Sequence, residues 1–95
     1  MTAQKKVTVK EAETVALGAL SYLAADDERL ARFLETTGLR PDTIRAAASS
    51  AGFLVAVLDY VAHDEPLLLG LSGFLQTKPE SIMAARWTLS LSEFD

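Results

Sequence analysis

Three prolines divide the chain, and each stands where a polar cluster gives way to an apolar run. They are Pro41, Pro66 and Pro79. Proline is tolerated in the first turn of a helix, where its missing N–H would have no intrahelical partner, but it disrupts a helix interior. Each proline therefore predicts the start of a helix, and the chain is expected to fold as short helices joined by short loops.

Capping signals predict the other helix boundaries. Thr8 and Glu11 form a Thr-x-x-Glu capping box, which predicts a first helix that runs to about Ala25. The aspartate pair Asp26-Asp27 predicts the start of a second helix, which should end at Gly38. We expect the other four helices over residues 41–48, from 49 or 50 to about 62, after 64–66 and after 77. The predicted fold class is all-α, with about six short helices.

The chain also matches itself at an offset of 38 residues. Residues 15–47 align with residues 53–85, and nine of the 33 aligned positions are identical. One interpretation is a pair of three-helix units, in which the almost charge-free first and fourth helices pack together at the centre and the others lie outside. Leu20 and Leu58 would then share the core. The other interpretation is that short helical proteins share caps and leucines.

The pattern changes near the C-terminus. Trp87, Leu89 and Leu91 alternate with threonine and serine, which is the period of a strand rather than of a helix. We therefore expect an extended tail over residues 88–95. A flexible N-terminus over residues 1–7 completes a single predicted domain that spans residues 1–95.

Composition excludes several classes of protein. A hydrophobic fraction of 49% is too high for an intrinsically disordered chain. The absence of cysteine excludes disulfides, thiolate metal sites and thiol nucleophiles. No apolar run approaches the roughly 20 residues that span a bilayer. Glu11 and Glu13 also interrupt the region where a signal peptide would be apolar. We therefore expect a cytoplasmic chain without a membrane-spanning segment.

The sequence offers little catalytic chemistry. Its one histidine, His63, precedes Asp64 and Glu65, but histidine metal sites need two or three ligands at fixed spacing. A histidine at a helix C-terminus, beside a capping aspartate, explains the same residues. We expect no catalytic residue, no metal ligand and no cofactor, and we predict that the protein is not an enzyme.

A second function class is DNA binding. Residues 38–45, from Gly38 through Leu39 and Arg40 to Ile44 and Arg45, are similar to the turn and second helix of helix-turn-helix proteins. Four arginines make residues 29–48 locally basic, with Arg40 and Arg45 as candidate phosphate contacts. The following alanines offer no side chain to read base edges, and the formal net charge is −4. An ordinary turn between two helices therefore explains this segment as well, and nucleic acid is not the expected partner.

The leading hypothesis is a non-enzymatic protein-interaction module. Its candidate surface is the tail, with Trp87, Leu89, Leu91 and Phe94 as the contact residues. A symmetric homodimer would cover this apolar segment. The alternative is that Trp87 closes the core of its own monomer and that the residues after it fray.

Three segments carry a resemblance to a known family. They read LSYLAADDERL over residues 20–30, RFLETTGL over residues 32–39 and FLVAVLDY over residues 53–60. Together they resemble the small bacterial proteins of the domain of unknown function 3572 family, over most of residues 11–85. The resemblance implies an all-helical cytoplasmic fold and supplies no activity, cofactor or site. Arg40 departs from the serine, threonine or aspartate that usually precedes the proline of the third helix in such sequences.

Overall fold

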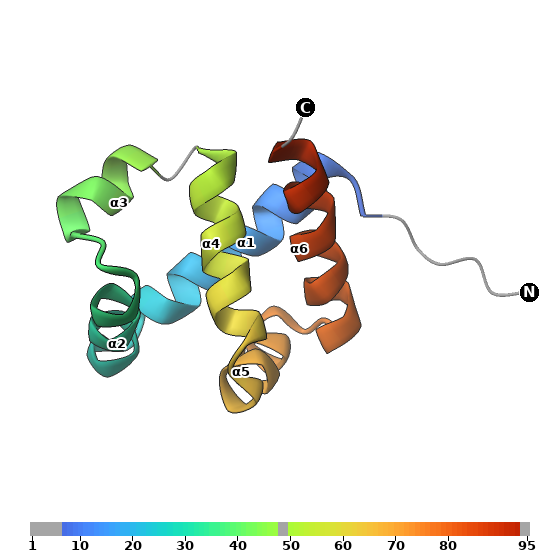
Figure 1. Ribbon diagram of the computed structural model, residues 1–95. Coiled ribbons are helices and arrows are strands. Elements are labelled where there is room, and N and C mark those ends of the chain that lie inside the picture. Colours follow the sequence, from blue (N-terminus) through green and yellow to red (C-terminus); the bar gives the residue numbers. More distant parts are fainter. Residues whose placement is uncertain (1–6, 48–49, 94–95) are drawn as a thin grey trace, which may run out of the picture.

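The chain folds into an all-α structure, as predicted. The computed structural model describes residues 7–47 and 50–93, and these residues contain six helices and no strand. The helices are α1 (Val9–Ala24), α2 (Asp27–Thr37), α3 (Pro41–Ala47), α4 (Ala51–Ala62), α5 (Glu65–Leu75) and α6 (Pro79–Glu93). Figure 1 shows α2 and α3 on one side of the molecule and α6 on the other.

Hydrogen bonds confirm four of the predicted helix starts. The Thr8 hydroxyl accepts from the Glu11 N–H at 3.1 Å, while the Glu11 carboxylate accepts from the Thr8 N–H at 2.9 Å. Asp26, Ser50 and Asp64 cap α2, α4 and α5 with a side-chain oxygen that accepts from backbone N–H groups of the first turn. These bonds satisfy donors that have no partner within the helix.

Two helices end in the left-handed region of backbone space. Gly38 caps α2 with φ of 75°, as its glycine predicts, and its N–H donates to the Leu34 carbonyl at 2.8 Å. Gln76 caps α5 with φ of 54°, a conformation that costs a residue with a β-carbon. The turn after Gln76 is tied back by the Thr77 N–H, which donates to the Ser72 carbonyl at 3.0 Å.

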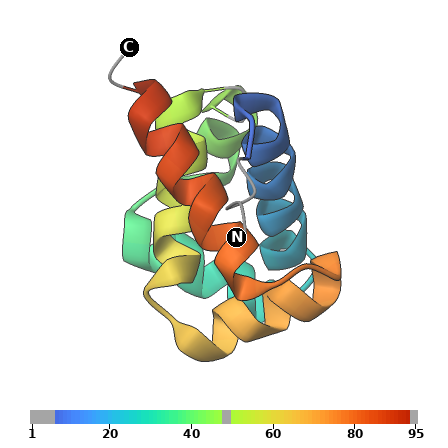
Figure 2. The ribbon, with the colours of Figure 1, turned by 90° about the vertical axis from the view of Figure 1, so that its right-hand side faces the viewer.

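The core lies between α1, α4 and α6, which pack against one another. We expected α1 and α4 to form the centre with all other helices outside, but α6 packs against both of them. Figure 2 shows α6 lying across α1 and α4. The fully buried large side chains include Leu23 of α1, Phe33 of α2, Leu54, Val57, Leu58 and Val61 of α4, Leu71 of α5, and Ile82 and Leu89 of α6.

Two glycines let α5 approach α1 closely. A β-carbon added to Gly18 of α1 would lie 2.8 Å from a methyl group of Leu75 on α5. Reciprocally, a β-carbon added to Gly70 of α5 would collide with the hydroxyl of Tyr22 on α1. Each helix therefore contributes one glycine and one large side chain to this contact.

The predicted extended tail is wrong. Residues 88–93 continue α6, and residues 94–95 lie outside the described part of the chain. The three alternating apolar residues do not share one face. Leu89 faces the core, whereas the side chains of Trp87 and Leu91 are exposed on the helix. At the other end, only Val7 of the expected N-terminal segment 1–7 lies in the described part of the chain. Val7 is partly buried, and its carbonyl accepts from the Thr88 hydroxyl at 3.1 Å.

The proposed repeat is not confirmed. Leu58 is fully buried, as the repeat requires, but Leu20 is only partly buried. The third helices of the two units also differ. Although Pro41 and Pro79 occupy equivalent positions in the alignment, α3 is 7 residues long and lies at the edge, whereas α6 is 15 residues long and packs into the core.

Candidate interaction surface

The helical geometry of α6 separates its apolar side chains onto two faces. Ile82, Ala85 and Leu89 recur at spacings of three and four residues and have no exposed surface. This face packs against α1 and α4. The remaining large apolar side chains of α6 must therefore point away from the core.

Met83, Trp87 and Leu91 form the opposite face, which we name the α6 outer face. Their exposed fractions are 38%, 64% and 52%. Residues four apart lie one above the other on a helix, so the three side chains form a continuous apolar strip. In Figure 2 no described helix lies in front of α6.

The sequence-predicted contact residues are only partly brought together. Trp87 and Leu91 lie on the α6 outer face, whereas Leu89 is fully buried and does not belong to a surface. Phe94 lies outside the described residues. Met83 was missed, although its spacing of four from Trp87 is the signal that a helical reading of the tail would have used.

An ion pair flanks the α6 outer face. Nε and Nη2 of Arg86 donate to the same carboxylate oxygen of Asp59 on α4, at 2.9 and 2.6 Å. His63, which caps the C-terminus of α4 as predicted, donates from Nδ1 to the Asp59 carbonyl oxygen at 2.8 Å. The Arg86 guanidinium is thus held toward α4.

Of the two predicted phosphate contacts, only the side chain of Arg40 lies in the described part of the chain. Arg40 is exposed, and its Nε lies 3.6 Å from the carboxylate of Asp42. Arg45 lies in α3, but its side chain is outside the part of the chain that the structure describes. Arg29 places its guanidinium 4.0 Å above the ring of Tyr22, where it makes a cation–π contact. Leu39 and Ile44 are partly buried against the core, as the helix-turn-helix motif would require.

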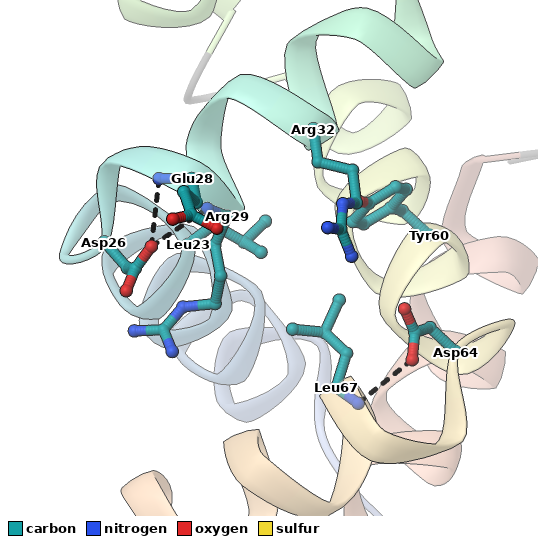
Figure 3. Close-up of a pocket in the computed structure, with 8 residues that line it drawn as sticks. All are labelled: Leu23, Asp26, Glu28, Arg29, Arg32, Tyr60, Asp64 and Leu67. Atoms are coloured by element: carbon teal, nitrogen blue, oxygen red, sulfur yellow. Dashed lines mark hydrogen bonds between the residues drawn. The ribbon is translucent and has the colours of Figure 1, made fainter.

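A polar pocket of about 220 Å³ opens between α2, α4 and α5. Its lining residues are Leu23, Asp26, Glu28, Arg29, Arg32, Tyr60, Asp64 and Leu67. Figure 3 shows Arg29 and Arg32 leaving α2 in different directions, and both capping aspartates bound to backbone N–H groups. Nε of Arg29 is buried without a hydrogen-bond partner in the described structure. The pocket thus holds charges of both signs, and its two capping aspartates already stabilise the starts of α2 and α5.

A second, apolar groove of about 210 Å³ lies between α1, α2 and α3. It is lined by Leu20, Ala24, Leu30, Leu34, Pro41 and Ile44. Across residues 7–47 and 50–93, no group of three or more histidine, aspartate and glutamate side chains is placed to hold a metal ion. In the same residues, no helix is long and apolar enough to span a membrane.

These features define a small all-α protein with an exposed apolar face on its last described helix. The chain belongs to the family described as "Protein of unknown function (DUF3572)", whose model matches residues 9–91. No curated protein and no solved structure matches it.

Proposed function

We propose that this chain is a non-enzymatic protein-interaction module that binds its partner through the α6 outer face. The observation that carries the proposal is the exposure of three large apolar side chains along one helical face. Tryptophan and methionine are enriched at protein interfaces, and tryptophan is a frequent hot spot. Trp87, the most exposed of the three, is the expected anchor.

The pairing of the neighbouring charge supports the same proposal. Interface centres are depleted of charged side chains because their desolvation is costly. The charged side chain closest to Trp87 in the sequence is Arg86, which pairs with Asp59 at the flank of the helix. A partner can therefore cover the α6 outer face without burying an unpaired charge.

Site-specific photocrosslinking tests this proposal. A photoreactive amino acid replaces Leu91, and the matched control carries it at Leu69 of α5, an apolar side chain with a similar exposed fraction of 56%. Both variants are produced in the native cell and irradiated. We expect a protein adduct from position 91 that is absent from position 69. Equal labelling from both positions, or none from position 91, would contradict the proposal.

DNA binding is the alternative function, and the positions of Leu39 and Ile44 against the core favour it. Fluorescence anisotropy with random duplex DNA at low and high salt tests it. We expect no binding at micromolar concentrations. Binding that weakens steeply as salt rises, and that is lost in Arg40→Ala/Arg45→Ala, would replace the interaction module with a DNA-binding protein.

A further inference from the structure

We infer that the α6 outer face binds a second copy of this chain, in an antiparallel contact of two α6 helices around a two-fold axis at Trp87. The inference rests on the proposed function and names its partner. It is carried by the charge of the face, by the order of its side chains and by the composition of the rest of the chain.

The charge of the molecule restricts where two copies can meet. Each copy carries a formal net charge of −4, so two copies repel one another over most approaches. Between Glu80 and Glu93, α6 has one charged side chain, Arg86, and that side chain is held by Asp59 of α4. The α6 outer face is therefore an uncharged strip on an acidic molecule, where contact between two copies meets little repulsion.

The order of side chains on α6 matches itself in reverse. Met83 and Leu91 stand four residues before and after Trp87, and both are large and apolar. Ala84 and Ser90 stand three residues before and after it, and both are small. In an antiparallel pair centred on Trp87, Met83 lies level with Leu91 of the second copy, and Ala84 lies level with its Ser90. A two-fold contact requires such self-matching, and the small residues let the two helix backbones approach.

Residues 1–6 are a poorer match for this face than a second copy of α6. Residues 1–6 contain two lysines, and Met1 is their only large apolar side chain. The α6 outer face runs over eight residue steps, which is about 12 Å at the helical rise of roughly 1.5 Å per residue. A contact of this length buries less than the roughly 800 Å² per partner of a standard interface, so we expect association in the micromolar range.

The single tryptophan provides a direct readout. Because Trp87 is the only tryptophan, all tryptophan emission reports on the surroundings of this one side chain. As the protein concentration rises through the micromolar range, we expect the emission to shift to shorter wavelength while the mass from sedimentation velocity doubles. In Trp87→Ser, sedimentation should show association weakened at least tenfold. The matched control Leu69→Ser removes a side chain of similar exposure from α5 and should associate like the unmodified chain.

Disulfide trapping tests the orientation, because the natural chain has no cysteine. In the antiparallel pair, Met83→Cys of one copy lies level with Leu91→Cys of the other along the contact strip, so mixing the two variants under oxidation should give a linked dimer. Either variant alone should not, because two copies of position 83 are displaced by about 12 Å along the axes, beyond the Cα separation of about 7 Å that a disulfide spans. A disulfide dimer of Met83→Cys alone would overturn the antiparallel arrangement.

The two proposals fail separately. A monomer mass at every concentration would overturn self-association, even if position 91 crosslinks a different protein and the proposed function stands. An adduct of twice the chain mass from position 91 would support both. Circular dichroism of Trp87→Ser and Leu69→Ser should match that of the unmodified chain, since both replaced side chains are exposed.

Discussion

The hydroxyl of Tyr22 on α1 occupies the space into which a β-carbon on Gly70 of α5 would project. The centroid of the same tyrosine ring lies 5.1 Å from the ring centroid of Phe74 on α5. The ring also lies beneath the guanidinium of Arg29 on α2. Tyr22 thus connects three helices, and Gly70 makes that position available. The packing of Tyr22 therefore requires glycine at position 70 of α5.

Gly70→Ala should therefore destabilise the protein by about 1–3 kcal/mol, as overpacking of a close contact does. Removing the obstructing hydroxyl with Tyr22→Phe should recover part of that loss in the double variant. Gly73→Ala is the matched control on the same helix, because a β-carbon there has no neighbour within 4 Å. It should be neutral or stabilising by up to about 1 kcal/mol. Urea denaturation measures all four variants, and an equal loss from Gly70→Ala and Gly73→Ala would contradict the contact.

The two left-handed helix ends predict opposite effects of adding and removing a β-carbon. Gly38→Ala should lower the free energy of unfolding by about 1–2 kcal/mol, because φ at that position is 75°. Gln76→Gly should raise it by up to about 1 kcal/mol, because it relieves a side chain at φ of 54°. Thermal and urea denaturation together provide the measurement. A gain in stability from Gly38→Ala would be incompatible with the Gly38 geometry.

Truncation of two leucines should distinguish the observed core from the one that the repeat predicts. Leu58→Ala should cost about 2–5 kcal/mol, because Leu58 is fully buried between packed helices. Leu20 lines the apolar groove and is partly buried, so Leu20→Ala should cost less than about 2 kcal/mol. Equally large losses of unfolding free energy at both positions would support the symmetric core that the repeat predicts.

The ion pair between Asp59 and Arg86 should contribute modestly to stability. Both side chains are partly exposed, at 46% and 32%, so water and salt screen the attraction. A double-mutant cycle with Asp59→Asn and Arg86→Gln should give a coupling free energy below about 1 kcal/mol that decreases at high salt. A coupling of several kcal/mol, unchanged by salt, would indicate a desolvated pair instead.

The sequence predicted those parts of the fold that depend on local hydrogen bonding. Thr8 with Glu11, Asp26 and Gly38 all act within one helical turn, so their roles can be identified from spacing alone. The final helix was missed because five alternating residues fit a strand as well as a helix. In a strand these three apolar side chains would share one face, whereas in α6 Leu89 is buried on one face and Trp87 and Leu91 are exposed on the other.

The candidate site was only partly predicted, because the helical form of the last segment was missed. Trp87 and Leu91 were identified as surface residues, but Leu89 was assigned to that surface when its neighbours α1 and α4 in fact bury it. Which apolar residues of a helix face the core depends on contacts between segments distant in sequence, which a local pattern does not contain. The Tyr22 and Gly70 contact is of the same kind.

The packing of α1 against α6 also has a consequence for how quickly the fold forms. The Thr88 hydroxyl and the Val7 carbonyl, which bond to one another, are 81 residues apart in sequence. Small helical proteins usually fold fast because most of their contacts are local, and long closures slow them. In this chain the contact between the first and last described helices closes a loop that contains α2 to α5. Its folding rate should therefore lie closer to that of a mixed α/β domain than to that of a simple helical bundle.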